Sequence, residues 1–176
     1  MDERAWIDEA LTVGAGIEIG ACRVTRQRPH HAAFISGDLD AAVARLAPGA
    51  NAVGLCDFPR SDAYAIRISR DQALLVTASP LEPSAGWHGS FALSPADDRF
   101  IPLGVTGPGA RGVLAQGTSA DLGQGSPSAA IFFCGGHALL IGAENGYTLW
   151  IEAAYRYAVT TFLRSAQPIE GPVSEA

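Results

Sequence analysis

Histidines and cysteines are the side chains of this sequence that could hold a metal ion or attack a substrate. They are spread along the whole chain, at His30, His31, His88, His137, Cys22, Cys56 and Cys134. No pair has helical or C-x-x-C spacing, and the adjacent His30 and His31 would point to opposite sides of a strand. We therefore predict no metal site and three reduced thiols, as in a cytoplasmic protein.

A glycine-rich segment from Gly14 to Gly20 imitates a dinucleotide-binding fingerprint. That site needs a strand before the glycines and a helix after them, because the helix N-terminus binds the pyrophosphate. Here a helix-like segment precedes the glycines and strand-like residues follow them. The segment is better interpreted as a flexible turn.

Two further patterns imitate catalytic groups. The stretch from Gly117 to Asp121 has the wrong residues for the G-x-S-x-G turn of serine hydrolases. Asp97 and Asp98 could form an acid–base pair, but neighbouring carboxylates in a loop are more often solvated charges. Neither pattern predicts a catalytic site.

The composition excludes several classes of function. The net charge is −6 and no run of Lys or Arg occurs, so binding to nucleic acid or to an anionic membrane surface is not expected. Apolar runs such as 129–133 are too short to span a bilayer, and residues 1–4 do not start a signal peptide. Hydrophobic residues make up 48% of the chain, which fits either a well-filled core or a surface covered by a partner.

The first half of the chain has the pattern of a strand, a helix and a hairpin. Asp38 is a good N-cap for the helix, and Pro48 with Gly49 ends it. Two apolar stretches then flank a short polar turn, which is typical of a hairpin. The expected elements are a helix at 2–11, strands at 17–19, 22–25 and 31–35, a helix at 39–46, and a hairpin of 64–69 with 73–77.

The second half repeats this order. Pro108 suits the first turn of a helix, and Asn145-Gly146 between apolar runs is a strong hairpin signal. A last helix from Glu152 to Arg164 is expected to place Ala154, Ala158, Val159, Phe162 and Leu163 inward. The other expected elements are a strand at 100–106, a helix from Ala110 that ends at Gly117, and strands at 129–133, 137–143 and 147–151.

The two patterns predict an α+β fold made of two ferredoxin-like strand–helix–hairpin halves with antiparallel or mixed sheets. We expect one domain over residues 1–165, with halves at about 1–78 and 100–165. Residues 79–99 are rich in Pro, Gly and Ser and are expected to join the halves. Residues 166–176 have no pattern and are expected to be a flexible tail.

The second half resembles the folate-binding domain of aminomethyltransferases. The segment from Phe100 to Leu114 is similar to their strand, Gly-Pro turn and helix, and the segment from Thr118 to Leu122 follows where that family has a short element containing Asp. Leu149-Trp150, followed by a helix that contains Tyr155 and Tyr157, resembles the gamma subunit of heterotetrameric sarcosine oxidases. The resemblance covers residues 100–165 and extends to the first half only through the order of its elements.

The resemblance implies a non-catalytic subunit of a flavoenzyme that demethylates sarcosine or a related N-methyl amine and passes the one-carbon unit to tetrahydrofolate. It implies larger alpha and beta partner subunits that carry FAD, FMN and NAD, and no cofactor on this chain. The alternative is a free-standing protein that binds tetrahydrofolate or transfers one-carbon units. A third interpretation is a ligand-binding module with no link to a flavoenzyme.

Asp121 is the one candidate catalytic residue that the resemblance provides. Folate-dependent aminomethyltransferases have an Asp at the matching element that assists one-carbon transfer, whereas an Asp in a turn more often accepts backbone N–H groups. Trp87 and Trp150 could stack on a pterin, although core or interface packing is the commoner use of Trp. The cofactor-binding residues stay undetermined at this level.

Overall fold

The computed structural model describes residues 12–28, 31–82 and 84–168. Within these ranges, twelve strands form two six-stranded sheets, accompanied by three α-helices and one 3₁₀ turn. The α+β class is confirmed, and the sheets are antiparallel apart from one parallel pair of strands. The predicted helix at 2–11 and most of the predicted tail lie outside the described residues.

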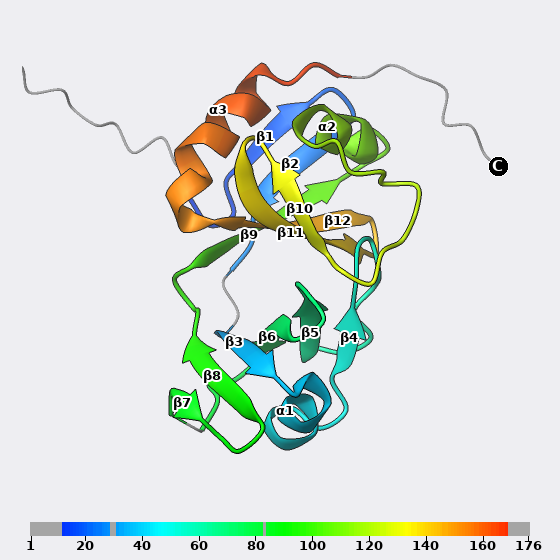
Figure 1. Cartoon of the computed structure of the whole chain (residues 1–176). Coiled ribbons are helices and arrows are strands. Elements are labelled where there is room, and N and C mark those ends of the chain that lie inside the picture. Colours follow the sequence, from blue (N-terminus) through cyan, green and yellow to red (C-terminus); the bar gives the residue numbers. More distant parts are fainter. Residues whose placement is uncertain (1–11, 29–30, 83, 169–176) are drawn as a thin grey trace, which may run out of the picture.

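The first sheet, called sheet A, has the strand order β1-β2-β9-β12-β11-β10. Its strands are β1 (Gly16–Ile19), β2 (Cys22–Arg26), β9 (Phe100–Thr106), β10 (Ala130–Phe133), β11 (Gly136–Ala143) and β12 (Gly146–Glu152). The helices α2 (Ala110–Gly117) and α3 (Arg156–Ser165) cover its outer face, with the 3₁₀ turn η1 (Ala153–Tyr155) leading into α3 (Figure 1).

The second sheet, called sheet B, has the strand order β4-β5-β6-β3-β8-β7. Its strands are β3 (His31–Gly37), β4 (Asn51–Val53), β5 (Tyr64–Arg67), β6 (Gln72–Thr77), β7 (Gly86–Trp87) and β8 (Phe91–Pro95). The helix α1 (Leu39–Leu46) covers its outer face. Its predicted N-cap is confirmed, because the Asp38 carboxylate accepts a hydrogen bond from the Ala41 amide at 3.0 Å.

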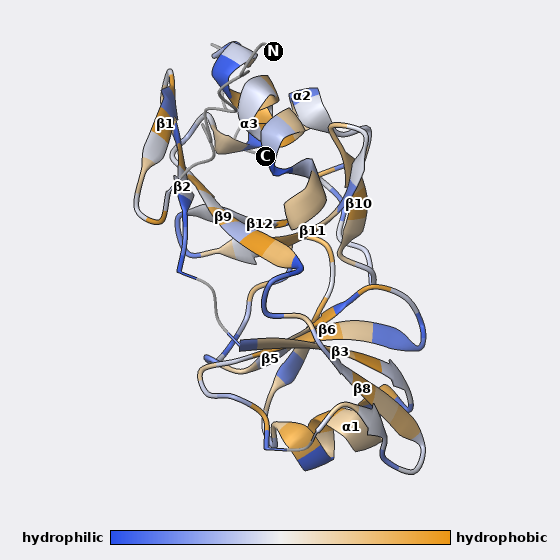
Figure 2. Cartoon of the chain, turned by 90° about the vertical axis from the view of Figure 1, so that its left-hand side faces the viewer, coloured by the Kyte–Doolittle hydropathy of each residue, from blue (hydrophilic) through white to orange (hydrophobic). Residues whose placement is uncertain are grey.

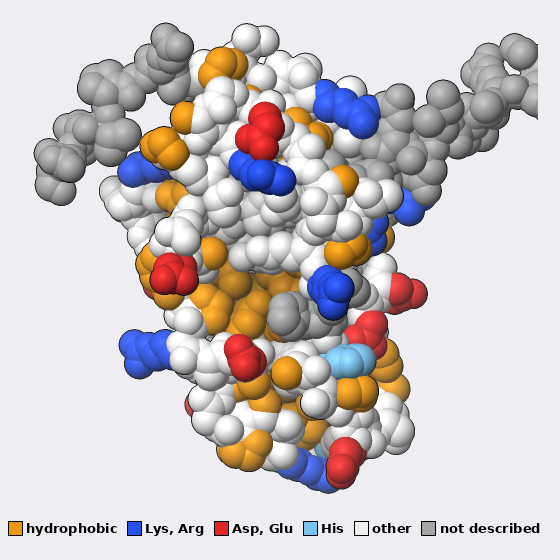
Figure 3. Space-filling model, turned by 180° about the vertical axis from the view of Figure 1, so that it is seen from behind, with side chains coloured by type: hydrophobic (Ala, Val, Ile, Leu, Met, Phe, Trp, Pro, Cys, Tyr) orange, Lys and Arg blue, Asp and Glu red, His pale blue; other side chains and the backbone are white. Residues whose placement is uncertain are grey.

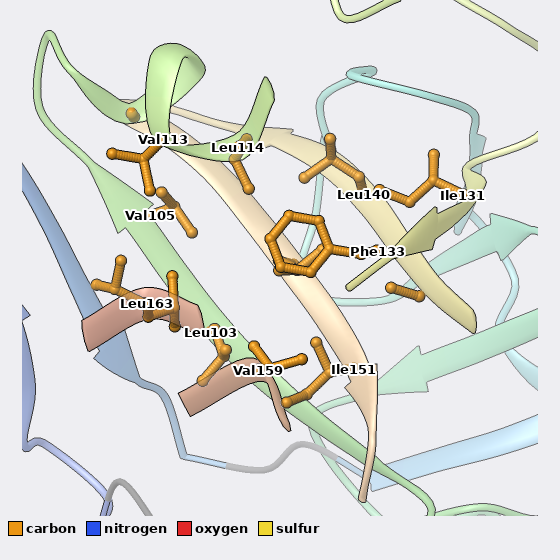
Figure 4. Packing of buried hydrophobic residues seen from close by; sticks show 14 of the residues in the cluster. Leu103, Val105, Val113, Leu114, Ile131, Phe133, Leu140, Ile151, Val159 and Leu163 are labelled. Atoms are coloured by element: carbon orange, nitrogen blue, oxygen red, sulfur yellow. The ribbon is translucent and has the colours of Figure 1, made fainter. Parts of the chain in front are cut away.

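The four layers run in the order helices α2 and α3, sheet A, sheet B and helix α1, and Figure 2 shows them stacked. One core lies between sheet A and its helices, where Phe133 packs among Leu103, Leu140 and other aliphatic side chains (Figure 4). A second core lies between the two sheets and contains Trp150 and Ile66. A third lies between sheet B and α1.

The two hairpins at the ends of the sheets are exchanged between the sequence halves. The β1–β2 hairpin precedes β3 in the chain but pairs with β9, through the register Val24 to Val105. The β7–β8 hairpin precedes β9 but pairs with β3, through the register Ile35 to Leu93. Residues 79–99, expected only to join the halves, thus contribute two strands to sheet B. Each sheet is completed by a hairpin that lies, in the sequence, directly before the other sheet's central strand.

The direction in which the last helix faces was predicted partly wrong. Val159 and Leu163 are buried as expected, but Ala154 and Ala158 are exposed. The 3₁₀ turn η1 has three residues per turn instead of 3.6, so the buried stripe of α3 is rotated relative to a continuous α-helix. Thr160 is buried in their place, and its hydroxyl donates to the Arg156 carbonyl at 2.7 Å.

No described helix is both long and apolar enough to cross a bilayer.

Candidate functional site

Asp121 lies in the loop of residues 118–128, between α2 and β10. Its side chain is exposed, and its Oδ1 atom accepts a hydrogen bond from the Gly123 amide at 2.8 Å. A carboxylate that binds the amide two residues later forms an Asx turn, which shapes the loop. The carboxylate therefore has a structural partner, and its other oxygen remains available to solvent.

Three other polar side chains gather near Asp121. A β-carbon placed on Gly123 would lie 2.6 Å from Arg111 Nη2 and 3.1 Å from Asp121 Oδ1, so the guanidinium and the carboxylate flank this glycine. The Cys56 thiol lies 4.0 Å from the carbonyl oxygen of the adjacent Leu122. Tyr147 is opposite Gly142 in the sheet register, and a β-carbon on Gly142 would lie 2.6 Å from the Cys56 carbonyl oxygen, so Tyr147 lies near Cys56. We call these four residues, Cys56, Arg111, Asp121 and Tyr147, the Asp121 cluster.

Burial raises the pKa of two members of the cluster, Cys56 and Tyr147. It raises the pKa of the Cys56 thiol, the positive charge of Arg111 offsets part of this rise, and Asp57 adds to it. Burial likewise raises the pKa of the Tyr147 phenol. Both groups therefore keep their protons at neutral pH, so Cys56 is a thiol and not the thiolate that nucleophilic chemistry needs. The cluster is equipped for hydrogen bonding and charge pairing.

Cys56 has an unusual backbone. Its φ angle is 61°, in the left-handed region that residues other than Gly, Asn and Asp rarely adopt. The backbone around it is fixed on both sides, because the Gly54 amide donates to the Asp57 carboxylate at 2.9 Å and the Gly142 amide donates to the Asp57 carbonyl at 2.9 Å. These bonds hold the Cys56 side chain toward the loop that carries Asp121.

The structure separates the two candidate stacking residues from Asp121 and from each other. Trp87 is 76% exposed on the edge strand β7, whereas Trp150 is 1% exposed in the core between the sheets. Tyr147 packs on the helix side of sheet A and Trp150 on the opposite side, as their odd spacing on β12 requires. Among the described residues, the Trp150 indole N–H has no hydrogen-bond acceptor.

The histidines have separate structural contacts. His31 Nδ1 lies 3.5 Å from Asp97 Oδ1, His88 Nε2 lies 2.8 Å from the Ser84 carbonyl oxygen, and His137 packs on the ring of an exposed Phe. Asp97 also accepts from the Ala32 amide at 2.9 Å, so it ties its loop to β3. Within the described ranges no three His, Cys, Asp or Glu side chains could share a metal ion. His30 lies outside those ranges.

A strand begins within the glycine-rich segment. Gly16 is the first residue of β1, so no helix N-terminus follows the glycines to bind a pyrophosphate. Similarly, Thr118 in the second imitation motif accepts from the Ala120 amide through its hydroxyl at 3.2 Å, which is a local turn contact. Neither segment has the local structure of the site that it imitates.

Comparison with known proteins shows a similarity to a solved structure. No family model matches the chain, and no curated protein matches its sequence. Among solved structures, a chain of the heterotetrameric sarcosine oxidase from Corynebacterium sp. U-96, in complex with pyrrole 2-carboxylate, is similar with a TM-score of 0.62. The match covers 84% of this chain and 86% of that chain at 17% identity. This chain therefore shares the fold of a chain of that enzyme.

Sequence reasoning found Asp121 but missed the other three members of its cluster. Cys56 is more than 60 residues from Leu122 in the sequence, yet the two are in contact. Their approach depends on the isolated bridge between Leu55 and Ser126, which joins the loop after β4 to the loop before β10. No local pattern signals such a contact, so only the tertiary structure could reveal it.

Proposed function

We propose that this chain is a non-catalytic, gamma-type subunit of a heterotetrameric sarcosine oxidase-like flavoenzyme. The observation that carries the proposal is the coverage of the structural match, at 84% of this chain and 86% of the other. Because the match covers most of both chains, no large part of either chain lies outside the shared fold. In this proposal FAD, FMN and NAD belong to larger alpha and beta subunits, and the complex oxidises sarcosine or a related N-methyl amine.

The Asp121 cluster supports a role without catalysis. General-base chemistry needs a group that accepts a proton near neutral pH within reach of the substrate. In the cluster, the thiol and the phenol hold their protons, and the carboxylate already accepts a backbone amide. These groups can bind or pair with another surface without reacting.

The sheet edges support a role in assembly. Sheet A ends in β10 and sheet B ends in β7, and each of these edge strands carries an exposed aromatic side chain. Phe132 on β10 is 59% exposed and Trp87 on β7 is 76% exposed. Open strand edges with large apolar side chains are a liability that proteins usually cover. Figure 3 also shows apolar side chains gathered in a hollow at the waist of the molecule.

The proposal is tested by co-expression with the large flavoprotein subunits of the same organism. A tagged form of this chain should elute with them as one complex that has flavin absorbance and oxidises sarcosine or another N-methyl amine. Phe132→Ser and Trp87→Ser should weaken assembly, whereas Asp121→Asn should leave turnover unchanged. Elution of the chain alone, beside a flavoprotein that is fully active without it, would refute the proposal.

The alternative, a free-standing protein that binds tetrahydrofolate, is favoured by the convergence of three polar side chains around Asp121. It requires the isolated chain to bind tetrahydrofolate and requires Asp121→Asn to weaken that binding. Glu144→Gln, which removes an exposed carboxylate from the β11–β12 turn, is the matched control. A fluorescence titration of the isolated chain with tetrahydrofolate separates the two functions, because the subunit proposal expects no saturation.

A further inference from the structure

A groove of about 220 Å³ lies beside α1 on the outer face of sheet B. We call it the α1 groove. Its walls are mainly small apolar side chains from α1, from the loop before β4 and from β4, β5 and β6, together with two charged residues. The lining residues are Leu39, Asp40, Val43, Ala44, Ala50, Ala52, Ala65, Arg67 and Ala73.

The groove exists because α1 covers only part of the sheet. The helix contacts mainly β3, β6 and β8, whereas Ala52 on the outer face of the edge strand β4 remains exposed. In the sheet register, Ala52 is opposite Ala65, and Ala73 is opposite Arg67. Three alanines on adjacent strands leave a depression where larger side chains would fill the space. An apolar cavity of ~150 Å³ holds a benzene molecule, so the α1 groove has room for a small organic ligand.

Arg67 is the feature that points to a charged ligand. Its side chain is only partly exposed and lines the groove, and it has no ion pair or hydrogen-bond partner among the described residues. A partly desolvated guanidinium without a partner is unfavourable, because it has lost water without gaining an acceptor. Guanidinium groups bind carboxylates through two parallel hydrogen bonds, which fits an arginine in the wall of a mainly apolar groove.

Asp40 limits what else the ligand can carry. It lies in the first turn of α1 and also lines the groove, where its negative charge opposes a second anionic group. A dicarboxylate or a phosphate ester would therefore be disfavoured relative to a monocarboxylate. A neutral apolar molecule would fill the groove but would leave Arg67 unpaired.

We propose that the α1 groove binds a small apolar monocarboxylate, with its carboxylate on Arg67 and its hydrocarbon body against the alanines of sheet B. The site lies on the opposite side of sheet B from sheet A and does not include the Asp121 cluster. The inference therefore stands or fails independently of the proposed assembly with flavoprotein subunits.

The test is an NMR titration of the ¹⁵N-labelled full chain with three ligands of the same branched shape. Isovalerate should shift the amides of α1 and β5 and saturate with a Kd of roughly 1 mM, as expected for so small a ligand. Isovaleramide, which is neutral, should bind about tenfold or more weakly, because it forms no charge-assisted hydrogen bonds. The dicarboxylate 3-methylglutarate should also bind more weakly, and Asp40→Asn should restore its binding.

Variants assign the site. Arg67→Gln should weaken isovalerate binding about tenfold or more, whereas Arg70→Gln, with the same charge change on the exposed turn of the same hairpin, should not. Ala52→Leu should block binding by filling the groove from the edge strand β4, where Ala52 is exposed. Equal binding of isovalerate and isovaleramide, unchanged binding by Arg67→Gln, or no saturable shift at roughly 20 mM isovalerate would each overturn the proposal.

Discussion

Replacing Trp150 by Phe should leave the stability of the protein almost unchanged, although this side chain is at the centre of the fold. Trp150 is 1% exposed between the two sheets, on β12, and is flanked by Leu139 and Pro102 on the neighbouring strands. Its indole N–H is buried without an acceptor among the described residues. The substitution removes this donor together with part of the apolar ring.

Two opposing terms set the result. The smaller ring loses the burial of about two carbon atoms, at ~0.8 kcal/mol each, so the apolar loss is about 1.6 kcal/mol. Removing an unsatisfied buried donor recovers about 1–3 kcal/mol. The free energy of unfolding should therefore change by no more than ~1.5 kcal/mol, whereas Trp150→Ala, which empties the site, should lower it by about 3–5 kcal/mol.

Urea denaturation followed by far-UV circular dichroism measures the free energy of unfolding of both variants. Their midpoints can be compared if their m-values are equal to that of the original protein. Phe133→Leu is the control, because Phe133 is equally buried and has no donor to remove. Its loss of three buried carbons should cost about 2 kcal/mol. If Trp150→Phe instead cost ~3 kcal/mol or more, the indole N–H would have a partner in the folded protein and the reasoning would be wrong.

Three further outcomes test the fold. Gly107→Ala should destabilise the protein far more than Gly49→Ala in thermal melts. Both glycines have a φ angle near 90°, so the backbone strain is similar. However, a β-carbon on Gly107 would lie 2.2 Å from the Ala21 carbonyl oxygen, whereas one on Gly49 would contact no other atom within 4 Å. Asp38→Ala should lower the free energy of unfolding by about 1 kcal/mol through loss of the α1 cap, whereas Asp38→Asn should lose little. The free energy of unfolding should fall as the pH rises from 9 toward 11. Burial, and to a smaller extent the charge of Glu18, raises the pKa of Cys22 from 9.0 to about 11. In this pH range the unfolded chain therefore releases a proton that the folded chain keeps. Cys22→Ala should make this decline with pH shallower, and an unchanged pH profile would contradict that assignment.

The elements were predictable wherever a local signal defined them. Asp38 begins α1 as expected, and the tight turn before Gly146 joins β11 to β12. These signals act over a few residues, and their physics is contained in the sequence window. The strand β8 was missed because its neighbours are Pro, Gly and Ser, which are typical of loops. Its pairing with β3, more than 50 residues earlier, makes it a strand.

The candidate site was predictable only as a single residue. The family resemblance led to Asp121, and the structure shows the carboxylate in an Asx turn. Its neighbours Cys56, Arg111 and Tyr147 come from three other segments, and no spacing rule connects them. Arg67 was also missed, because an arginine at the end of a hairpin strand is unremarkable until the groove beside it is known.

The crosswise pairing of the terminal hairpins makes the chain equivalent to a domain-swapped dimer whose two copies are tethered in sequence. A single module consists of one hairpin and the strands and helices that follow it. Alone, its hairpin would have no sheet to pair with, because that hairpin pairs with the other module's sheet. Cleavage in the segment between β6 and β7 would therefore yield two fragments, each of which contains the hairpin that completes the other fragment's sheet. Such fragments should fold only when mixed, by mutual complementation.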